Sequence, residues 1–434
     1  MSNPASEGTE VARPAGLRDL LKNSNFRFLW LGQIISDFGD SLTNLSLLIL
    51  VNQLTGSTAA LATMLIVLTI PQITFGLIAG VYVDRLDRRR IMMASDALRG
   101  AMVLGFTLVG SADQLWLLYL IGFAQASVGT LFTPARGALL PNLVPASALL
   151  SANSISQTSR IIFGLLGTAS AGVLIGAFHV AWPAFLIDSL TFFVSLALIS
   201  RIRVARHVPE SAPAGNALAI FGELAEGMRL IARSRILIGT LVAAVVTMLG
   251  IGAVNVLIIP LIINDLRVPV TWFGAVEFAQ TGAMILSGSL VAVVASRLKP
   301  TGIVSLALIG TGIFIGMTSL VGNIWHLFPI LIGVGLMMTP LQAAIATIMQ
   351  TSVDNKMRGR VGASLNTVIS TASLLSMALA GILGEAIGVR SVFIVGGTIT
   401  VFAGMVAYLI FRTARSNRPS EQIVPASQIG VAAE

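Results

Sequence analysis

The chain of 434 residues contains no cysteine and only three histidines. The absence of cysteine excludes disulfides, thiolate metal sites and a cysteine nucleophile. The histidines, His179, His207 and His326, are far apart, so we expect neither a histidine metal site nor a histidine-based triad. No nucleotide-binding loop of the G-x-x-x-x-G-K-[ST] kind is present. The sequence therefore predicts a protein that is not an enzyme and needs no metal or other cofactor.

Charge is also scarce, because only 11% of the residues are charged, against about 25% in an ordinary soluble domain. The apolar residues fall in blocks of about 20, the length that crosses ~30 Å of hydrocarbon as a helix. The alternation typical of barrel strands is missing. These patterns predict an all-α membrane protein with twelve transmembrane helices. The expected spans cover residues 26–52, 58–83, 91–110, 114–136, 155–178, 181–201, 236–263, 271–296, 301–321, 326–350, 361–384 and 390–411.

The positions of the cations predict the orientation. If both termini are cytoplasmic, all 27 Lys and Arg except Arg267 and Arg390 fall in inside turns, tails or helix ends. By the positive-inside rule we expect a multi-pass protein of a bacterial-type cytoplasmic (inner) membrane. The net charge of +8 is spread over these turns, which argues against nucleic acid as a partner.

One long loop, residues 202–235, separates six spans from six. Its second part, NALAIFGELAEGMRLIARSR, has apolar residues at helical spacing and predicts an amphipathic helix on the inner membrane surface. The expected organisation is a cytoplasmic tail (1–25), a six-helix bundle (26–201), the linker (202–235), a second six-helix bundle (236–411) and a cytoplasmic tail (412–434).

The two halves resemble each other. Thr133-Pro134 recurs as Thr339-Pro340, and Ala171-Gly172 recurs as Ala380-Gly381, at nearly the same offset. These pairs predict two pseudo-symmetric bundles with a site between them and a rocking motion. Small residues in the fifth span, Gly164, Gly167 and Gly172, are typical of close helix packing.

The first span carries polar residues on one helical face. They are Gln33, Asp37, Asp40, Ser41 and Asn44. Asp37 lies ~15 Å deep at 1.5 Å per residue, and each carboxylate would cost roughly 2.5–3.5 kcal/mol at the bilayer centre. We therefore expect the face to line a wet cavity. Two ionised carboxylates three residues apart repel, so one is expected to hold a proton reversibly. The alternative is that they hydrate the cavity or bond other helices without titrating.

Other polar residues of the spans have two interpretations each. Glu277 and Gln280 begin a stripe in the eighth span, and Glu277 either pairs with the first-span acids across the cavity or is structural. Asp188 in the sixth span either acts in transport or makes a packing hydrogen bond to Ser or Thr. No span carries a lone buried Lys or Arg, so the cavity is expected to favour neutral or cationic amphiphiles over anions.

The densest group of charges is GVYVDRLDRRRIMM, from Gly80 to Met93. Such charge cannot stay in hydrocarbon, so this is a short turn at the membrane surface. Its acids and arginines either form an ion-pair network or simply anchor the turn. Asp96 and Arg99 in the third span are expected to form a local ion pair that supports an inner gate. Arg136, at the end of the fourth span, either binds the acids of this turn or anchors its helix.

The same turn resembles the signature of the major facilitator superfamily between its second and third helices. Gly80, Asp84, Arg85, Arg88 and Arg89 fall on the main positions, and Asp87 replaces the usual second glycine. Further segments, SDALRG (95–100), TPARGALLPNLVP (133–145) and MRGRVGASLN (357–366), look most like the third drug:proton antiporter group, which contains macrolide-efflux proteins and the enterobactin exporter.

The resemblance implies that Asp84 meets the N-terminus of the eleventh helix in the outward-facing state, and that the neighbouring arginines stabilise this inner gate. The chain departs from related antiporters in two segments. Gly122-Phe123-Ala124-Gln125 lacks the membrane arginine of their fourth helix, and Gly167-Thr168 replaces their Gly-Pro in the fifth.

Together these features predict a secondary transporter that works by alternating access as a monomer in the lipid bilayer. The expected activity is export of amphiphilic drugs, macrolide-like compounds or siderophore-like metabolites in exchange for protons. The alternatives are a facilitator of lysophospholipid or other lipids without proton coupling, and a membrane sensor that transports nothing.

Overall fold

The computed structural model describes residues 17–203, 217–269, 271–354 and 357–416. In these ranges the chain is helical throughout, apart from short turns, and the predicted all-α fold of twelve long helices in two bundles is confirmed. The first bundle contains α2 (Ser24–Thr55), α3 (Thr58–Arg85), α4 (Arg88–Leu104), α5 (Leu115–Leu139), α6 (Leu149–Phe178) and α7 (Trp182–Ile199). The second contains α9 (Arg235–Pro260), α10 (Thr271–Arg297), α11 (Pro300–Met317), α12 (Ile324–Ser352), α13 (Arg358–Ile387) and α14 (Val389–Ser416). The short α1 (Leu17–Lys22) precedes the first bundle, and α8 (Ala217–Arg233) precedes the second.

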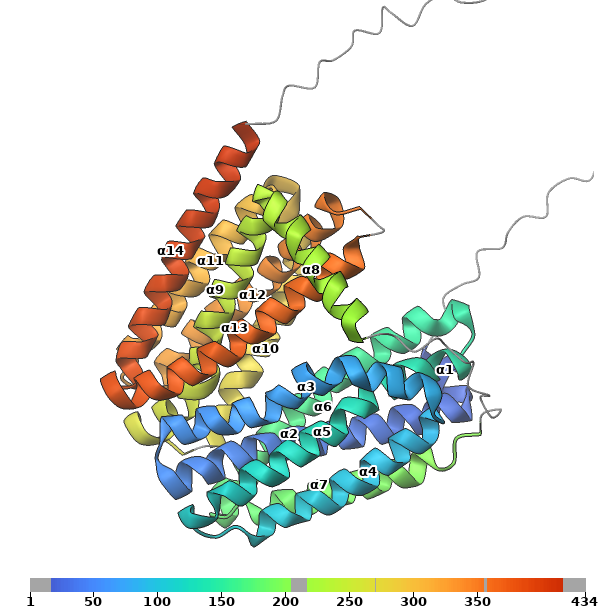
Figure 1. Ribbon diagram of the computed structural model, residues 1–434. Coiled ribbons are helices and arrows are strands. Elements are labelled where there is room, and N and C mark those ends of the chain that lie inside the picture. The colour runs from blue at the N-terminus through green and yellow to red at the C-terminus, as the bar shows by residue number, and fades with distance from the viewer. Residues whose placement is uncertain (1–16, 204–216, 270, 355–356, 417–434) are drawn as a thin grey trace, which may run out of the picture.

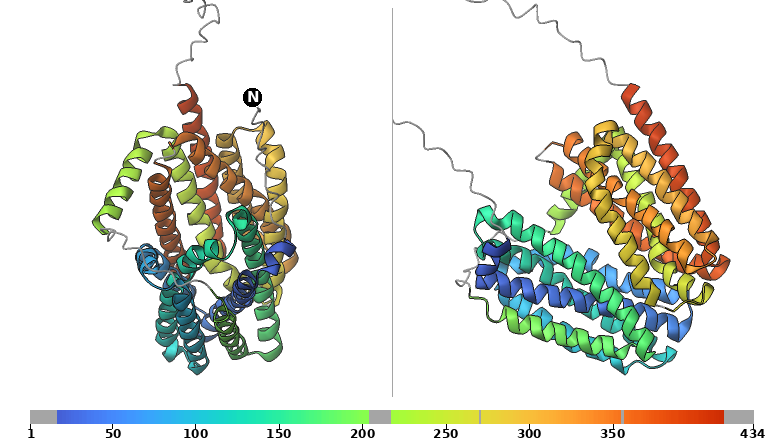
Figure 2. Two further views of the ribbon diagram at one scale, coloured as in Figure 1. Left: turned by 90° about the vertical axis from the view of Figure 1, so that its right-hand side faces the viewer. Right: turned by 180° about the vertical axis from the view of Figure 1, so that it is seen from behind.

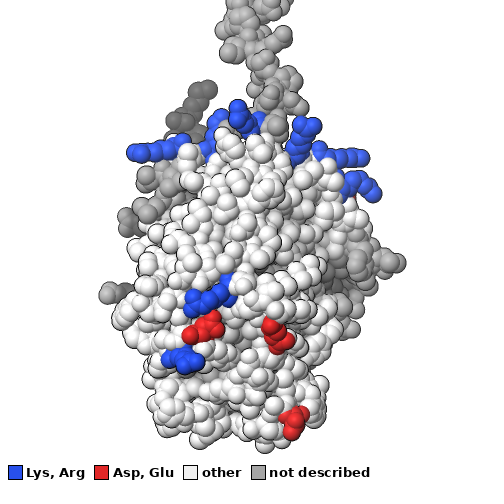
Figure 3. All heavy atoms as spheres, turned by 90° about the vertical axis from the view of Figure 1, so that its left-hand side faces the viewer, with Lys and Arg blue, Asp and Glu red and all other residues white. Residues whose placement is uncertain are grey.

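Eleven of the helices are long and apolar enough to cross a membrane, judged on the described residues. The remaining long helix, α10, has 27 residues and coincides with the expected eighth span. Figure 3 shows the side of the molecule on which α14 lies, where a broad belt without charged side chains separates a row of Lys and Arg from a smaller mixed group. Such a belt is what hydrocarbon requires of a surface that contacts it.

Local capping sets the tight connection between α2 and α3. Gly56 adopts a left-handed backbone, with a φ of 63°, directly after α2. The hydroxyl of Ser57 then accepts a hydrogen bond from the backbone N–H of Ala60 at 3.0 Å and caps α3. A left-handed glycine followed by a serine cap ends one helix and begins the next within two residues.

The two bundles meet near one end and diverge toward the other (Figures 1 and 2). We call the end at which α2 begins and α7 and α14 finish the terminal end, and the end at which α2 joins α3 the opposite end. Between the bundles α3 packs against α13, and α6 packs against α10. One apolar cluster joins the first bundle to the second, whereas the terminal half of each bundle has a smaller cluster of its own.

Helix α8 forms within the linker, and its inner side contacts protein. Gly227 lies against the backbone of Arg360, and the hydroxyl of Ser364 donates to the carbonyl oxygen of Leu224 at 2.9 Å. Ile231, from the predicted apolar stripe, is buried. Helix α8 thus packs along α13 of the second bundle, and its expected position at the inner membrane surface stays a prediction.

Glycine permits the closest helix contacts. A Cβ atom at Gly167 of α6 would collide with the carbonyl oxygen of Phe38 and would lie 3.0 Å from the Cβ of Ser41, both on α2. Gly164 lies one turn away against the Ser41 hydroxyl, and Gly172 is buried in the same helix. In the second bundle Gly381 packs on Ala59 and Ala62 of α3.

We expect Gly167→Ala to lower the free energy of unfolding by about 1–3 kcal/mol, because the added methyl group must push α6 away from α2. The matched control is Gly137→Ala, also in a helix, where the methyl group meets open space and should be neutral or slightly stabilising. The measurement is thermal and denaturant unfolding of the purified protein in detergent. Equal unfolding midpoints for the two variants would show that α6 and α2 can accommodate the methyl group at no cost in stability.

Candidate functional site

A group of charged side chains is buried between α2, α4 and α7. Arg99 of α4 forms an ion pair with Asp40 of α2, and its guanidinium also lies over the ring of Phe192 of α7, 4.3 Å from the centroid. The side chain of Arg99 is 12% exposed and that of Asp40 is 28% exposed. Asp96 and Asp188 are fully buried, and their charges also act on Arg99. We call Asp40, Asp96, Arg99 and Asp188 the Arg99 cluster.

The cluster holds more acids than its hydrogen bonds satisfy. Within the described chain, neither carboxylate oxygen of Asp96 accepts a hydrogen bond of normal geometry, although the Ser195 hydroxyl interacts with this carboxyl group. Asp188 accepts a hydrogen bond from the Thr191 hydroxyl at 3.1 Å. Its other oxygen has no hydrogen bond of normal geometry within the described chain, although the Thr43 hydroxyl interacts with this carboxyl group. Three carboxyl groups therefore share one guanidinium. Buried charges are costly unless paired, so this arrangement favours a proton on an acid of the cluster or a second position for Arg99.

Small residues bring the cluster together. A side chain at Gly39 would collide with Asp188 and Thr191, and one at Gly32 would lie 3.2 Å from the Ser195 hydroxyl. These two glycines let α2 approach α7 closely enough for Asp40 to reach Arg99. Of the two interpretations of Asp188, the packing hydrogen bond is present, and the same side chain also faces the arginine.

The predicted ion pair between Asp96 and Arg99 is wrong. The ion-pair partner of Arg99 is Asp40 on another helix, and none of the ion pairs of the described chain includes Asp96. Arg99 also lies deeper than expected, because it follows the first residue of α4 by eleven positions, or ~16 Å at 1.5 Å per residue. The expectation that the spans contain no buried base is wrong for the same reason.

The polar face of α2 divides between two neighbourhoods. Asp40 turns toward α4 and α7, whereas Asp37 interacts electrostatically with Arg136 of α5 and Arg160 of α6 as well as with Asp40. Gln33 is buried with its amide nitrogen unpartnered. Asn44 is exposed.

Arg136 therefore acts on Asp37 instead of serving only as an anchor. Among the described acids, Asp37 is the one whose charge acts on it. Glu277 and Gln280 lie half-buried on α10. Among the described residues no interaction joins Glu277 to Asp37 or Asp40, and the expected pairing across the cavity stays a prediction.

The arginines of the predicted gate bind helix ends. Arg88 donates to the carbonyl oxygen of Ala138 at 2.9 Å, and Arg89 donates to those of Ile199 and Ser200, with its Nε 3.1 Å from the former. Cations near a helix C-terminus offset its unpaired carbonyl groups and its dipole. Gly80 and the side chains of Asp84 and Arg85 lie outside the described residues, and so does the implied contact of Asp84.

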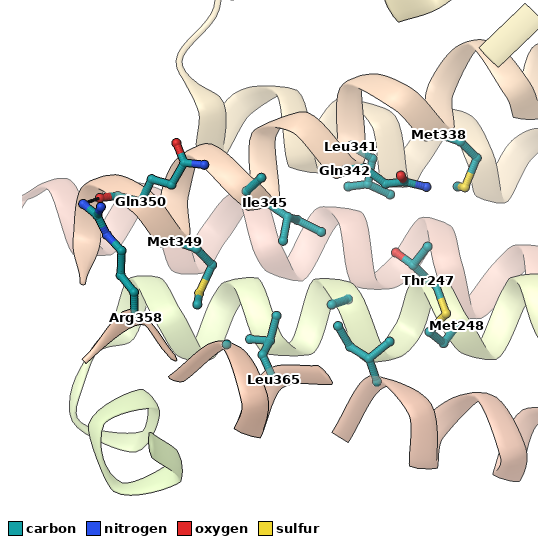
Figure 4. A pocket seen from close by; sticks show the side chains of 14 residues that line it. Thr247, Met248, Met338, Leu341, Gln342, Ile345, Met349, Gln350, Arg358 and Leu365 are labelled. Atoms are coloured by element: carbon teal, nitrogen blue, oxygen red, sulfur yellow. Dashed lines mark hydrogen bonds between the residues drawn. The ribbon is translucent and has the colours of Figure 1, made fainter. Parts of the chain in front are cut away.

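A cavity of about 480 Å³ opens between α9, α12 and α13 (Figure 4). Its wall is mainly apolar and includes three methionines, Met248, Met338 and Met349. Gln342 adds a polar group between them. Near the terminal end, Arg358 binds the carbonyl oxygens of Gln350 and Val353 and so stands fixed beside the cavity. Methionine is flexible and polarizable, which suits a wall that accepts differently shaped apolar ligands.

At the opposite end the bundles are joined by polar contacts. The carboxylate of Glu385, from α13, accepts hydrogen bonds from the hydroxyl of Ser57 and from the backbone N–H of Ala59 at the start of α3. Next to it, the buried Thr58 hydroxyl donates to the Gly381 carbonyl oxygen at 2.7 Å. A carboxylate at a helix N-terminus is a favourable arrangement, and we call these contacts the opposite-end latch.

The sequence profile described as Major Facilitator Superfamily matches residues 29–375 and, in a second match, residues 240–430. The chain belongs to the Major Facilitator Superfamily. As a member of that superfamily, it is a multi-pass membrane transporter and not an enzyme. The alternative of a non-transporting sensor is therefore set aside.

Several superfamily members are similar over nearly the whole chain. Macrolide efflux protein A of Streptococcus pyogenes is 24% identical over 394 residues, covering 89% of this chain and 95% of the relative. Multidrug efflux pump Tap of Mycobacterium tuberculosis is 27% identical over 407 residues, covering 89% and 94%. The crystal structure of a bacterial homologue of the human lysosomal transporter Spinster, inward-facing and unoccupied, superposes with a TM-score of 0.70 at 15% identity, covering 94% of this chain and 100% of that one. The last likeness concerns the fold.

Two features of this superfamily member went unpredicted although the sequence carries their signals. Counting residues from the start of α4 places Arg99 as deep as the first-span acids. On α12, Met338, Gln342, Ile345 and Met349 recur every three or four residues and so form one helical face. The approach of Gly39 to Asp188 had no such signal, because it depends on how two helices pack.

We expect Arg99→Gln to lower the free energy of unfolding by about 3–5 kcal/mol, because three buried acids would lose their only cation. Arg90→Gln is the control, since Arg90 is 78% exposed and pairs with Asp87 at 3.7 Å on the surface; it should change nothing measurable. Adding Asp40→Asn to Arg99→Gln should restore part of the loss. If the two single variants unfolded alike in detergent, the cluster would not depend on the arginine.

We expect Glu385→Gln to loosen the opposite-end latch, because the neutral amide is a weaker acceptor at the start of α3. The cysteine-free chain allows spin labels at Gln53→Cys and Ile387→Cys, one on each bundle. Distances between the labels should gain a longer component in the Glu385→Gln background. The control, Asp113→Asn, removes an exposed acid between α4 and α5 and should leave the label distances unchanged. If Glu385→Gln also left the distances unchanged, these contacts would not act as a latch.

Proposed function

We propose that this transporter exports neutral or cationic amphiphilic compounds from the cytoplasm in exchange for protons. The observation that carries the proposal is the Arg99 cluster, in which three carboxyl groups surround one guanidinium inside a membrane bundle. Ionisable groups in membrane spans mark ion and substrate pathways far more often than they serve packing. The number of acids exceeds what one arginine neutralises, so the cluster has room for a proton.

Asp40 is the acid through which the proton enters the cluster. It is the more exposed member of the ion pair, at 28% against 12% for Arg99, whereas Asp96 and Asp188 are sealed. A proton on Asp40 neutralises the carboxylate that holds Arg99. The guanidinium is then drawn toward the carboxyl groups of Asp96 and Asp188. Asp40 is on α2, whereas the other two acids are on α4 and α7. Protonation of Asp40 and the movement of Arg99 would therefore change the charge on the polar face of α2.

Asp37 extends the same face toward Arg136 and Arg160. A cationic substrate and a proton would compete for the negative charge of Asp37 and Asp40. Coupling requires that substrate and proton favour different protonation states of one cavity, and this competition supplies the difference. Glu277 and Gln280, half-buried on α10, would belong to the same substrate path in the second bundle.

The cavity beside Met248, Met338 and Met349 supports an amphiphilic substrate. Its volume of about 480 Å³ falls in the range of small-molecule pockets, and its wall offers apolar contact with few fixed hydrogen-bond partners. The names of the relatives, a macrolide efflux protein and a multidrug efflux pump, support export over uptake.

In this proposal the terminal end faces the cytoplasm, as the distribution of Lys and Arg predicts. The present conformation would then open inward, with the opposite-end latch closed. The protein would work as a monomer in the bilayer, with the substrate and protons as its partners. Rocking of the two bundles about their contact would expose the Arg99 cluster and the methionine-lined cavity to the two sides in turn.

We expect Asp40→Asn to lower pH-driven export at least tenfold, since the amide cannot exchange a proton with the cluster. The assay follows a fluorescent cationic amphiphile in proteoliposomes with an imposed pH gradient and with the gradient collapsed by an uncoupler. Asp37→Asn should reduce the same component, and Asp40→Glu, which keeps the carboxyl group, should retain part of it. Unfolding measurements check that each variant is folded.

Full gradient-driven export in the double variant Asp37→Asn/Asp40→Asn would remove these acids from the mechanism. Wild-type transport of the same rate with and without the gradient would instead favour the facilitator without proton coupling.

A further inference from the structure

A second cavity, outside the proposed transport path, lies at the terminal end of the first bundle. It has a volume of about 760 Å³ and is lined by the start of α2, by Arg89 at the start of α4, and by residues 200–203 after α7. Three arginines, Arg89, Arg201 and Arg203, line it together with Phe28, and none of its described lining residues is an acid.

The walls of this cavity are fixed by hydrogen bonds. The Asn25 side chain donates to the carbonyl oxygen of Arg203 and accepts from its N–H, both at 2.9 Å. Arg89 binds the carbonyl oxygens of Ile199 and Ser200. The segment after α7 is thus fastened to α2 and α4, and the arginines it carries are held at one place.

No acidic side chain of the described chain pairs with the arginines of the cavity. None of the ion pairs there includes Arg89, Arg201 or Arg203, and the side chains of Arg201 and Arg203 are exposed. Arg27 adds a further cation nearby, with its guanidinium 5.9 Å from the centre of the Phe28 ring. Like charges gathered in one cavity repel one another, and an anion bound there would remove that cost.

We propose that this cavity binds the headgroup of an anionic phospholipid. The phosphate would lie between Arg201 and Arg203, within reach of Arg89, and Phe28 would contact the glycerol and the first part of the acyl chains. The position favours a lipid because the cavity lies where three membrane-crossing helices begin or end, the depth at which headgroups lie. Arginine forms paired hydrogen bonds to phosphate, and basic pockets between membrane helices bind anionic headgroups.

The experiment titrates the full-length protein, purified in detergent, with short-chain phosphatidylglycerol and follows binding by calorimetry. Phosphatidylcholine of the same chain length tests charge, and glycerol 1-phosphate tests the headgroup without chains. The variant is Arg201→Gln/Arg203→Gln. The control, Arg229→Gln/Arg297→Gln, removes two exposed arginines at the terminal end of the second bundle.

The wild type and the control should bind phosphatidylglycerol alike and more tightly than phosphatidylcholine. The cavity variant should bind it about 30-fold more weakly, which corresponds to ~1 kcal/mol for each arginine. Equal affinity in the cavity variant and the wild type, or an equal loss in the control, would overturn the proposal. Binding of glycerol 1-phosphate as tight as that of the lipid would overturn the lipid as occupant and assign the cavity to a free phosphate ester. Unfolding midpoints confirm that both double variants are folded.

Discussion

The structure depends on the pairing of charge in a medium that does not solvate it. Arg99 lies deep in the first bundle, and it is held there by Asp40, by the face of Phe192 and by the charges of two further acids. The residues around Arg99 allow this pairing. Gly32 and Gly39 allow α2 to approach α7, and Thr191 satisfies one oxygen of Asp188.

The same constraint acts at the membrane surface in a different form. There Arg88 and Arg89, at the start of α4, bind carbonyl oxygens at the ends of α5 and α7, where helices leave acceptors unpaired. At the opposite end, the carboxylate of Glu385 accepts from the backbone N–H of Ala59 at the start of α3 and from the Ser57 hydroxyl. Charged side chains at both surfaces thus bind the unpaired groups of helix ends. The contacts of Glu385 also connect the second bundle to the first.

The fold was predictable from the sequence to a large degree, because hydrocarbon imposes a length and an apolar composition on each span separately. The boundary between α2 and α3 is also local, since Gly56 and Ser57 encode it. The site was predictable in its residues but not in its pairs. Asp96 and Arg99 stand one helical turn apart, yet Arg99 binds Asp40, because the rotation of α4 against α2 decides which acid it reaches. Arg88 and Arg89 bind backbone oxygens, which every residue carries and no sequence pattern marks.

The apolar cluster that joins the two bundles has a thermodynamic consequence for the transporter. If the bundles separate at the opposite end during transport, part of this shared cluster leaves its protein contacts. Apolar surface that meets water raises the heat capacity by about 0.45 cal/mol/K per Å², so the two conformations would differ in heat capacity. The enthalpy difference between the two conformations would then depend on temperature. A van't Hoff plot of their equilibrium constant would be curved instead of straight.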